Sequence, residues 1–284
     1  MNLIRQSWAL LTGRYLRQLY RQPAVIGITL TQPVIWLLLF GALFKKVAEI
    51  PGFGADSYIS YLTPGVVIMT ALFSSSWSGM SFIEDMDTGI MDRFLTAPVH
   101  RGALIVSSLA YQAVTTVVQS AIIIAIGWGI GAGFPGGAGG IAVLIAVSVL
   151  IALAMAGLSD GLALLVPQRE TLIAVSVLLA LAMAGLSNGL ALLSRQRETL
   201  IAASTTLVMP LTFLSGAFLS LHLVPGWIAA TARYNPVNWA ASAGREAIGA
   251  HPPWGTIGAY AGFLVAALLV TAALSTRAFR LAQR

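Results

Sequence analysis

The stretch EDMDTGIMDRFLTAPVHR, residues Glu84–Arg101, contains four of the ten acidic residues of this 284-residue chain. The tract before it carries no charged residue from 57 to 83, and the tract after it carries none from 102 to 159. Because each ionised group costs several kcal/mol in lipid, a charged island between two long apolar tracts cannot lie in the bilayer. We therefore expect residues 84–101 to form an aqueous loop between two membrane-spanning segments.

The composition indicates an all-α, polytopic membrane protein. Hydrophobic residues make up 57% of the chain and charged residues 9%, whereas a soluble domain has about 25% charged residues. The apolar runs are continuous and about twice as long as the alternating strands of a membrane β-barrel, which argues against that class. There is no cysteine and the three histidines are scattered, so no disulfide or metal site is expected. The basic residues behind the net charge of +6 lie at the ends of apolar segments, which favours a role in topology over nucleic-acid binding.

Residues 1–22 have the pattern of an amphipathic helix. Their apolar residues recur at spacings of four and three, which places them on one helical face, with arginines on another. We expect an interfacial helix on the cytoplasmic membrane surface, rather than a frayed basic tail or a signal peptide. The arginines would bind lipid headgroups or flank a partner, and the candidate residues are Trp8, Arg14, Arg17 and Arg21.

Six apolar segments have the length expected of membrane-spanning helices. They cover residues 24–44, 61–81, 103–130, a fourth segment from 141, 202–221 and 254–275. The glycine-rich residues 131–140 are expected to form a tight turn. Residues 222–248 are too polar to span, and their tryptophan and tyrosine content predicts an interfacial segment.

A tandem repeat interrupts this order. Residues 145–172 recur directly as residues 173–200, and the copies differ at only four positions: Ile151/Leu179, Asp160/Asn188, Val166/Ser194 and Pro167/Arg195. Each copy is one apolar helix followed by a QRET cap. The second copy therefore adds a single helix rather than a helical-hairpin repeat.

The positions of the basic residues predict the orientation. Arginines near the span ends place the N-terminal tail, the 84–101 island and the C-terminal tail in the cytoplasm, which requires an even number of crossings. Six segments satisfy this requirement, but a crossing by the second repeat copy makes seven. Three arrangements stay open: residues 173–193 do not cross fully, the C-terminal part is inverted, or the extra helix is held irregularly. We favour an added helix of unsettled orientation.

Several motifs together resemble the membrane subunit of ABC-2 type exporters, close to the daunorubicin-resistance and nodulation-type permeases. They are TQPVIWLLLFGALF (31–44), the 84–101 loop, the QRET turn, MPLTFLSGAFLSLHLVP (209–225) and ARYNPVNWAASAGREAI (232–248). The resemblance covers essentially all of residues 1–284, as a single transmembrane domain. It implies six membrane helices, a second permease subunit of the same or a different sequence, and a plasma (inner) membrane location. It also implies separate ATP-binding subunits that hold the ATP and magnesium, so no cofactor is expected in this chain.

The resemblance also assigns roles to two regions. The loop between the second and third spans is the family's coupling helix, which seats in a cleft of the ATPase and here falls on Glu84–Pro98. Polar contacts would come from Glu84, Asp85, Asp87, Asp92 and Arg93, the cleft would be filled by Ile90, Met91, Phe94 and Leu95, and Gly89 and Pro98 would permit the turn and end the helix. Residues 222–248 would form re-entrant helices on the outer side. Either their outer turn is shaped by four residues, or the same residues simply anchor the segment at the interface: Tyr234, Asn235, Pro236 and Arg245. The second copy of the fourth helix departs from the family pattern.

Two other functions stay open. Asp160 is a carboxylate within an apolar segment, and such an acid is a candidate functional residue for a proton-coupled carrier, although the repeat has Asn188 in its place. A membrane anchor that recruits a soluble partner through residues 84–101 is the other. The sequence has no G-x-x-x-x-G-K-[ST] phosphate-binding loop, so we expect a transporter subunit rather than an enzyme. Its nearly uncharged spans favour a hydrophobic or amphipathic substrate, drug-like or lipid-like. The resemblance to the exporter family implies that the substrate is exported.

Overall fold

The computed structural model describes residues 23–50, 53, 57–76, 78, 102–165 and 208–281. The predicted interfacial helix of residues 1–22, the 84–101 island and the second repeat copy (173–200) lie outside these residues. The described part is helical, and its elements are α2 (Pro23–Leu43), the 3₁₀ helix η1 (Lys45–Glu49), α3 (Tyr58–Ser76), α6 (Gly102–Gly129), α7 (Gly137–Leu165), α11 (Gly226–Ala232), α12 (Pro236–Ile248) and α13 (Trp254–Leu281).

Five of these helices are long and apolar enough to cross a membrane: α2, α3, α6, α7 and α13. Twenty residues of helix extend about 30 Å, which is the thickness of the hydrocarbon core of a bilayer. The helix α2 continues through Pro33, so this proline does not end the first span. The prediction of a polytopic helical bundle is confirmed.

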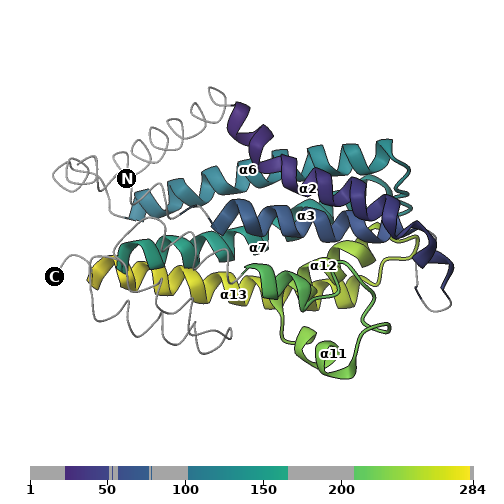
Figure 1. Cartoon of the computed structure of the whole chain (residues 1–284). Helices are drawn as coiled ribbons and strands as arrows, with labels where there is room; N and C mark the ends of the chain where they lie inside the picture. Colours follow the sequence, from purple (N-terminus) through teal and green to yellow (C-terminus); the bar gives the residue numbers. More distant parts are fainter. Residues whose placement is uncertain are drawn as a thin grey trace, which may run out of the picture.

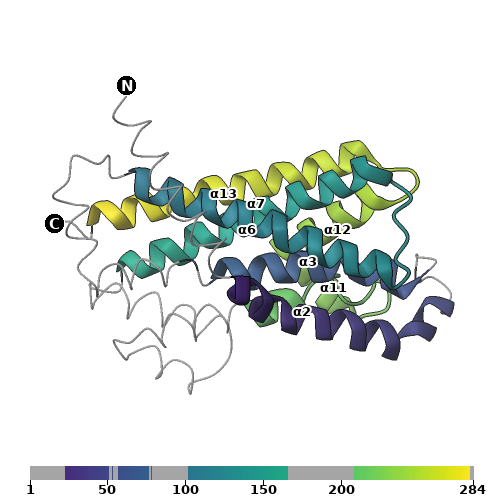
Figure 2. The same ribbon diagram turned by 90° about the horizontal axis from the view of Figure 1, so that it is seen from above.

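The five long helices lie side by side along one direction, and the short helices α11 and α12 lie toward one end of the bundle (Figures 1 and 2). We call this the α12 end. The opposite end, where α3, α7 and α13 finish and α6 begins, is called the stem end. The helix α7 is central, because it packs against α3, α6, α12 and α13, whereas α2 packs against α3 and α6.

The directions of the helices bear on the question of crossings. Figure 1 shows α6 running toward the α12 end, and α3, α7 and α13 running away from it. Because α7 and α13 share a direction, the chain must return to the α12 end between Leu165 and Trp254. Residues 208–217 run that way: Val208 packs in one cluster with Leu72 of α3, while the Gly216 carbonyl accepts a hydrogen bond from Tyr61, near the start of α3. In the described part of the chain, the last span thus has the same direction as α7.

The expected span 202–221 is not one continuous helix. Residues 208–213 are helical, but residues 214–217 form turns and the chain is irregular to residue 225. The Gly216 N–H is bonded to the side chain of Asn238 at 3.0 Å rather than to a helical carbonyl. Side-chain partners from another helix thus replace the helical hydrogen bonds, which apolarity alone does not reveal.

The expected glycine turn at 131–140 is also shorter than predicted, because α7 begins at Gly137. Gly140 is buried where α7 meets α12, and a Cβ atom there would overlap the carbonyl oxygen of Ala247. Small residues allow such close approach of helices in membranes. The glycine run therefore provides a contact surface for α12 as well as a turn.

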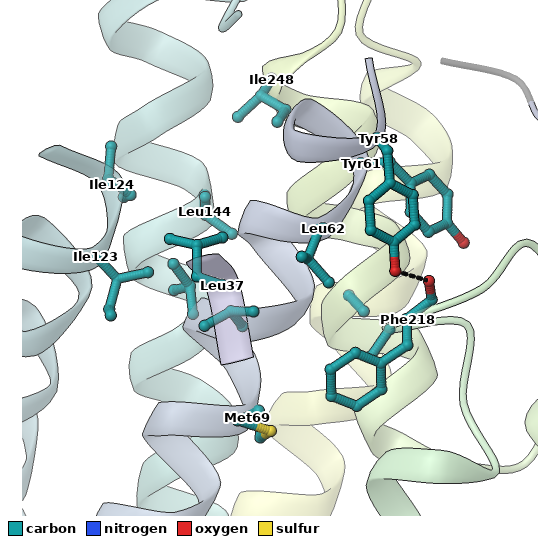
Figure 3. Close-up of a cluster of buried hydrophobic side chains, with 14 of the residues drawn as sticks. Leu37, Tyr58, Tyr61, Leu62, Met69, Ile123, Ile124, Leu144, Phe218 and Ile248 are labelled. Atoms are coloured by element: carbon teal, nitrogen blue, oxygen red, sulfur yellow. Dashed lines mark hydrogen bonds between the residues drawn. The ribbon is translucent and has the colours of Figure 1, made fainter. Parts of the chain in front are cut away.

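Two apolar clusters fill the bundle. One, shown in Figure 3, joins α2, α3, α6 and α7 through Leu37, Leu62, Ile123 and Leu144, all fully buried. The other joins α3, α7, α12 and α13 through residues that include Ile68, Val147 and Leu264. Leu144 belongs to the part of α7 that precedes the repeat, and the glycine-rich start of this helix, residues 137–140, is not duplicated.

The contact at Gly140 makes a testable prediction. Gly140→Ala should lower the free energy of unfolding by about 1–3 kcal/mol, because the added methyl group overlaps the Ala247 carbonyl. The matched control is Gly139→Ala, where nothing lies within 4 Å of the added atom and the better helix propensity of alanine should leave stability unchanged or raise it. Thermal unfolding of the two purified variants in detergent measures the difference, and equal melting temperatures would contradict this packing.

Candidate functional site

The start of α12 is built on Asn235, whose side chain uses both ends of its amide. Its oxygen accepts the backbone N–H of Val237 at 2.9 Å and so caps the helix. Its nitrogen donates to the carbonyl oxygens of Leu211 at 2.6 Å and Leu214 at 3.0 Å. Pro236 occupies the first helical turn, where a missing N–H is harmless. One side chain thus fixes the start of α12 to the end of the helical residues 208–213.

Arg245, near the end of α12, binds the backbone of the turn at 214–218. Its Nη2 atom donates to the carbonyl oxygen of Gly216 at 2.9 Å and lies 3.4 Å from that of Ala217. Its Nε atom donates to the carbonyl of Tyr61 at 3.3 Å, and its Cζ atom lies 3.7 Å from the centroid of the Tyr61 ring. The planar guanidinium can serve several carbonyls and a ring face at once, which an ammonium group cannot do.

Two tyrosines of α3 hold the same turn from the other side. Tyr61 donates its hydroxyl to the Gly216 carbonyl at 2.8 Å, and Tyr58 donates to the Phe218 carbonyl at 3.2 Å (Figure 3). Gly65, one turn further along α3, lies so close to Ala217 that a Cβ atom would overlap the Ala217 carbonyl oxygen. The turn therefore rests directly on the backbone of α3.

Aromatic rings extend this contact to α2. Phe213 and Phe218 stack at 5.4 Å between centroids, and Phe218 lies 5.7 Å from Trp36 and 5.8 Å from Phe40. Such pairs contribute roughly 0.5–1.5 kcal/mol each beyond their buried area. The turn at 214–218 is thus the junction at which α2, α3 and α12 meet, and we call it the outer junction.

Burial shifts the pKa values of the two charged side chains near the end of α12, Arg245 and Glu246. Burial lowers the pKa of Arg245, while Tyr61 and Glu246 oppose that shift. Burial raises the pKa of Glu246, and the positive charge of Arg245 opposes it. The Arg245 guanidinium stays charged throughout the physiological range. Its partners are carbonyl oxygens and an aromatic face, an arrangement that holds backbone in place.

The predicted site residues fall into three groups. Asn235, Pro236 and Arg245 come together at the outer junction, whereas Tyr234 is 84% exposed and contributes nothing to it. Asp160 is fully buried near the stem end, where Ser108 donates a hydrogen bond to it. The residues predicted to couple to an ATPase and to bind the membrane surface lie outside the described residues, so their roles stay predictions.

Sequence reasoning missed Tyr58, Tyr61 and Gly65. The signal that could have found them is a pair of tyrosines three residues apart at the start of a span, followed by a Pro-Gly pair at 64–65. Within the part of the chain that the structure describes, no group of three or more acidic or histidine side chains gathers as a metal site would require. The contacts of the outer junction hold α2, α3 and α12 in place relative to one another.

The outer junction predicts the effect of two substitutions. Arg245→Lys should lower the free energy of unfolding by about 2–3 kcal/mol, because lysine keeps the charge but loses the fork that reaches several carbonyls. Tyr61→Phe should cost about 1 kcal/mol, because it removes one hydrogen bond and keeps the ring. Thermal unfolding in detergent measures both, with exposed Arg233→Lys as the control. A variant at Arg245 as stable as the control would contradict the clamp.

Comparison with known proteins shows which protein family this chain resembles. The ABC-2 type transporter family model matches residues 6–176 and 171–248, and the two matches meet at the junction between the repeat copies. The chain is 35% identical over 125 residues to the transport permease ycf38 of Pyropia yezoensis, covering 43% of this chain and 42% of that protein. It is 31% identical over 131 residues to the ycf38 permease of Cyanophora paradoxa, covering 46% and 45%.

A longer match extends over most of the chain. It is 27% identical over 217 residues to the daunorubicin resistance ABC transporter permease protein DrrB1 of Streptomyces coeruleorubidus, covering 75% of this chain and 65% of that protein. The matched part spans less than half the length of the ycf38 permeases. The family model covers far more than half of this chain. The chain therefore belongs to the ABC-2 type transporter family and is a multi-pass membrane protein.

Proposed function

We propose that this chain is the permease subunit of an exporter that moves a hydrophobic or amphipathic substrate out of the cytoplasm. A separate subunit would bind ATP and magnesium and hydrolyse the ATP. The proposal rests on the position of the charged island, which lies between α3 and α6 in the sequence. The sequence joins α3 to α6 through residues 77–101, and both helices have these ends at the stem end (Figure 1). An ATP-binding subunit at that end would act directly on two adjacent spans.

The chemistry of the spans supports the substrate class. Asp160 is the one charged residue in the five candidate spans of the described chain. A path lined by such helices offers few ionic partners and suits an apolar or amphipathic molecule. The name of the Streptomyces relative refers to daunorubicin resistance, and daunorubicin is an amphipathic compound, which makes it a suitable first probe.

The exposed apolar faces of the bundle support the proposal of a second permease subunit. The helices α2 and α13 expose apolar side chains, among them Ile28, Leu39, Phe263 and Leu269. In a single subunit, lipid would cover both apolar faces. In a pair of permeases, the partner subunit would cover part of one face. We propose a location in the plasma (inner) membrane, with the stem end in the cytoplasm and the outer junction on the opposite side.

A transport assay tests the proposal. The permease is reconstituted with its co-expressed ATP-binding subunit, and ATP-dependent daunorubicin accumulation is measured in inside-out vesicles. Phe94→Asp should abolish accumulation, because a carboxylate would replace a ring expected to fill an apolar cleft of the ATPase. Thr88→Ala, within the same island, is the control. Full transport by Phe94→Asp, or accumulation that needs no ATP, would contradict the proposal.

A proton-coupled carrier is the second candidate, because Asp160 is fully buried. The same vesicles separate the two functions. ATP-driven export should persist when an ionophore collapses the proton gradient, whereas a carrier should stop. A plain membrane anchor would show transport under neither condition.

A further inference from the structure

Three helices meet through polar side chains at the stem end. The carboxylate of Asp160 on α7 is fully buried, and the Ser108 hydroxyl on α6 donates to its Oδ2 atom at 3.1 Å. The Oγ atom of Ser78, just beyond the end of α3, lies 3.1 Å from that of Ser108. Ser78 interacts with the Asp160 side chain as well. These three side chains therefore form one polar cluster. It links the end of α3 to the first two turns of α6 and to the last part of α7.

A second contact joins the same helices. Ser159, the neighbour of Asp160 on α7, donates its hydroxyl to the carbonyl oxygen of Ser76 at 2.7 Å. Ser76 is the last residue of α3, and the carbonyls in the last turn of a helix take partners from outside the helix. We call Ser76, Ser78, Ser108, Ser159 and Asp160 the stem brace.

The position of the stem brace along the chain is what gives it significance. Ser78 is the last described residue before the segment 79–101, and Ser108 lies about 9 Å along α6 from Gly102, where the described chain resumes. The two serines therefore flank the charged island on either side, and Asp160 connects them. Along the chain itself, the island is joined to the bundle at the two helix ends that the brace holds together.

The brace needs an acceptor at position 160, and a charge is not required. The Oδ1 atom of Asp160 has no hydrogen-bond partner among the described residues, and Ser108 donates to Oδ2. An asparagine could offer its amide oxygen to Ser108 in the same way. The chain itself has Asn188 at the corresponding position of the second repeat copy.

We infer that Asp160 is a positioning residue that fixes the end of α3 and the start of α6 relative to each other, at the base of the 79–101 segment. The inference rests on the proposed function, in which this segment receives motion from an ATP-binding subunit. Asp160 acts here as a hydrogen-bond acceptor that keeps two helix ends together, so that displacement of the island moves both. This role differs from that of a proton carrier, which requires an ionisable group.

Amide hydrogen exchange in lipid nanodiscs tests the brace without any partner. Asp160→Leu and the smaller change Ser108→Ala should each speed exchange in the last turn of α3 and the first two turns of α6, by roughly fivefold for one lost hydrogen bond. Asp160→Asn should keep the exchange of the natural chain, because it keeps the acceptor. Rescue by asparagine separates the acceptor role from a requirement for charge.

The control is Ser148→Ala. It removes the Ser120–Ser148 contact at 3.0 Å, which also joins α6 to α7 but lies about 18 Å from Asp160 along α7. It should leave exchange at the stem end unchanged. Equal effects of Ser148→Ala and Asp160→Leu would show general loosening and overturn the inference, as would fast exchange in Asp160→Asn or unchanged exchange in Asp160→Leu.

ATP-driven transport of daunorubicin by the complex with the ATP-binding subunit is the second readout. Asp160→Leu should transport less per ATP hydrolysed, and Asp160→Asn should match the natural chain. Faster exchange with unchanged coupling would show that the brace exists without positioning the island, which overturns the inference. If the natural chain transports nothing with ATP, the proposed function fails, while the exchange data still report on the brace itself.

Discussion

A buried polar group in the hydrocarbon core of a membrane must find its partner within the protein, because no water is present to supply one. Among the described helices, α6 carries more of these groups than any other and shares them with its neighbours. Gln119 donates to Thr29 of α2, Gln112 donates to Ser74 of α3, and Ser108 donates to Asp160 of α7. Apolar side chains gain little by leaving lipid for another apolar helix. Polar pairs and close contacts at glycine therefore set the register of the bundle.

The same constraint explains the outer junction. The helix from residue 208 stops at residue 213, so carbonyl groups in a partly buried turn need partners from elsewhere. Arg245 and Tyr61 satisfy the Gly216 carbonyl from two different helices. The broken helix, the arginine on α12 and the tyrosine on α3 thus form one unit, and none of them is explained alone. The stem brace solves the corresponding problem at the other end, where Ser159 satisfies the terminal carbonyl of α3.

The apolar runs predicted the ends of the long helices to within about six residues, because length and apolarity decide which segments can span a bilayer. They failed where tertiary contacts override local pattern. The segment 202–221 is as apolar as a span, yet Asn238, 22 residues beyond Gly216, takes the N–H that a helix would use. The sequence predicts that Arg245 shapes or anchors the re-entrant turn, but it does not predict the contact with Tyr61, which joins positions 184 residues apart. Such a pairing has no periodicity that a single sequence could display. The duplicated helix likewise leaves the number of crossings open, and the structure adds that α7 and α13 share a direction.

We propose that the charged island and the outer junction lie on opposite faces of the membrane, with the island in the cytoplasm. The chain contains no cysteine, so single cysteines in place of Thr88 and the exposed Ala250 report their own accessibility without further changes. Labelling with a membrane-impermeant maleimide, in right-side-out and inside-out vesicles, is the most direct test. The account predicts that position 88 reacts only from the cytoplasmic face and position 250 only from the outer face. Reaction of both positions from the same face would contradict it.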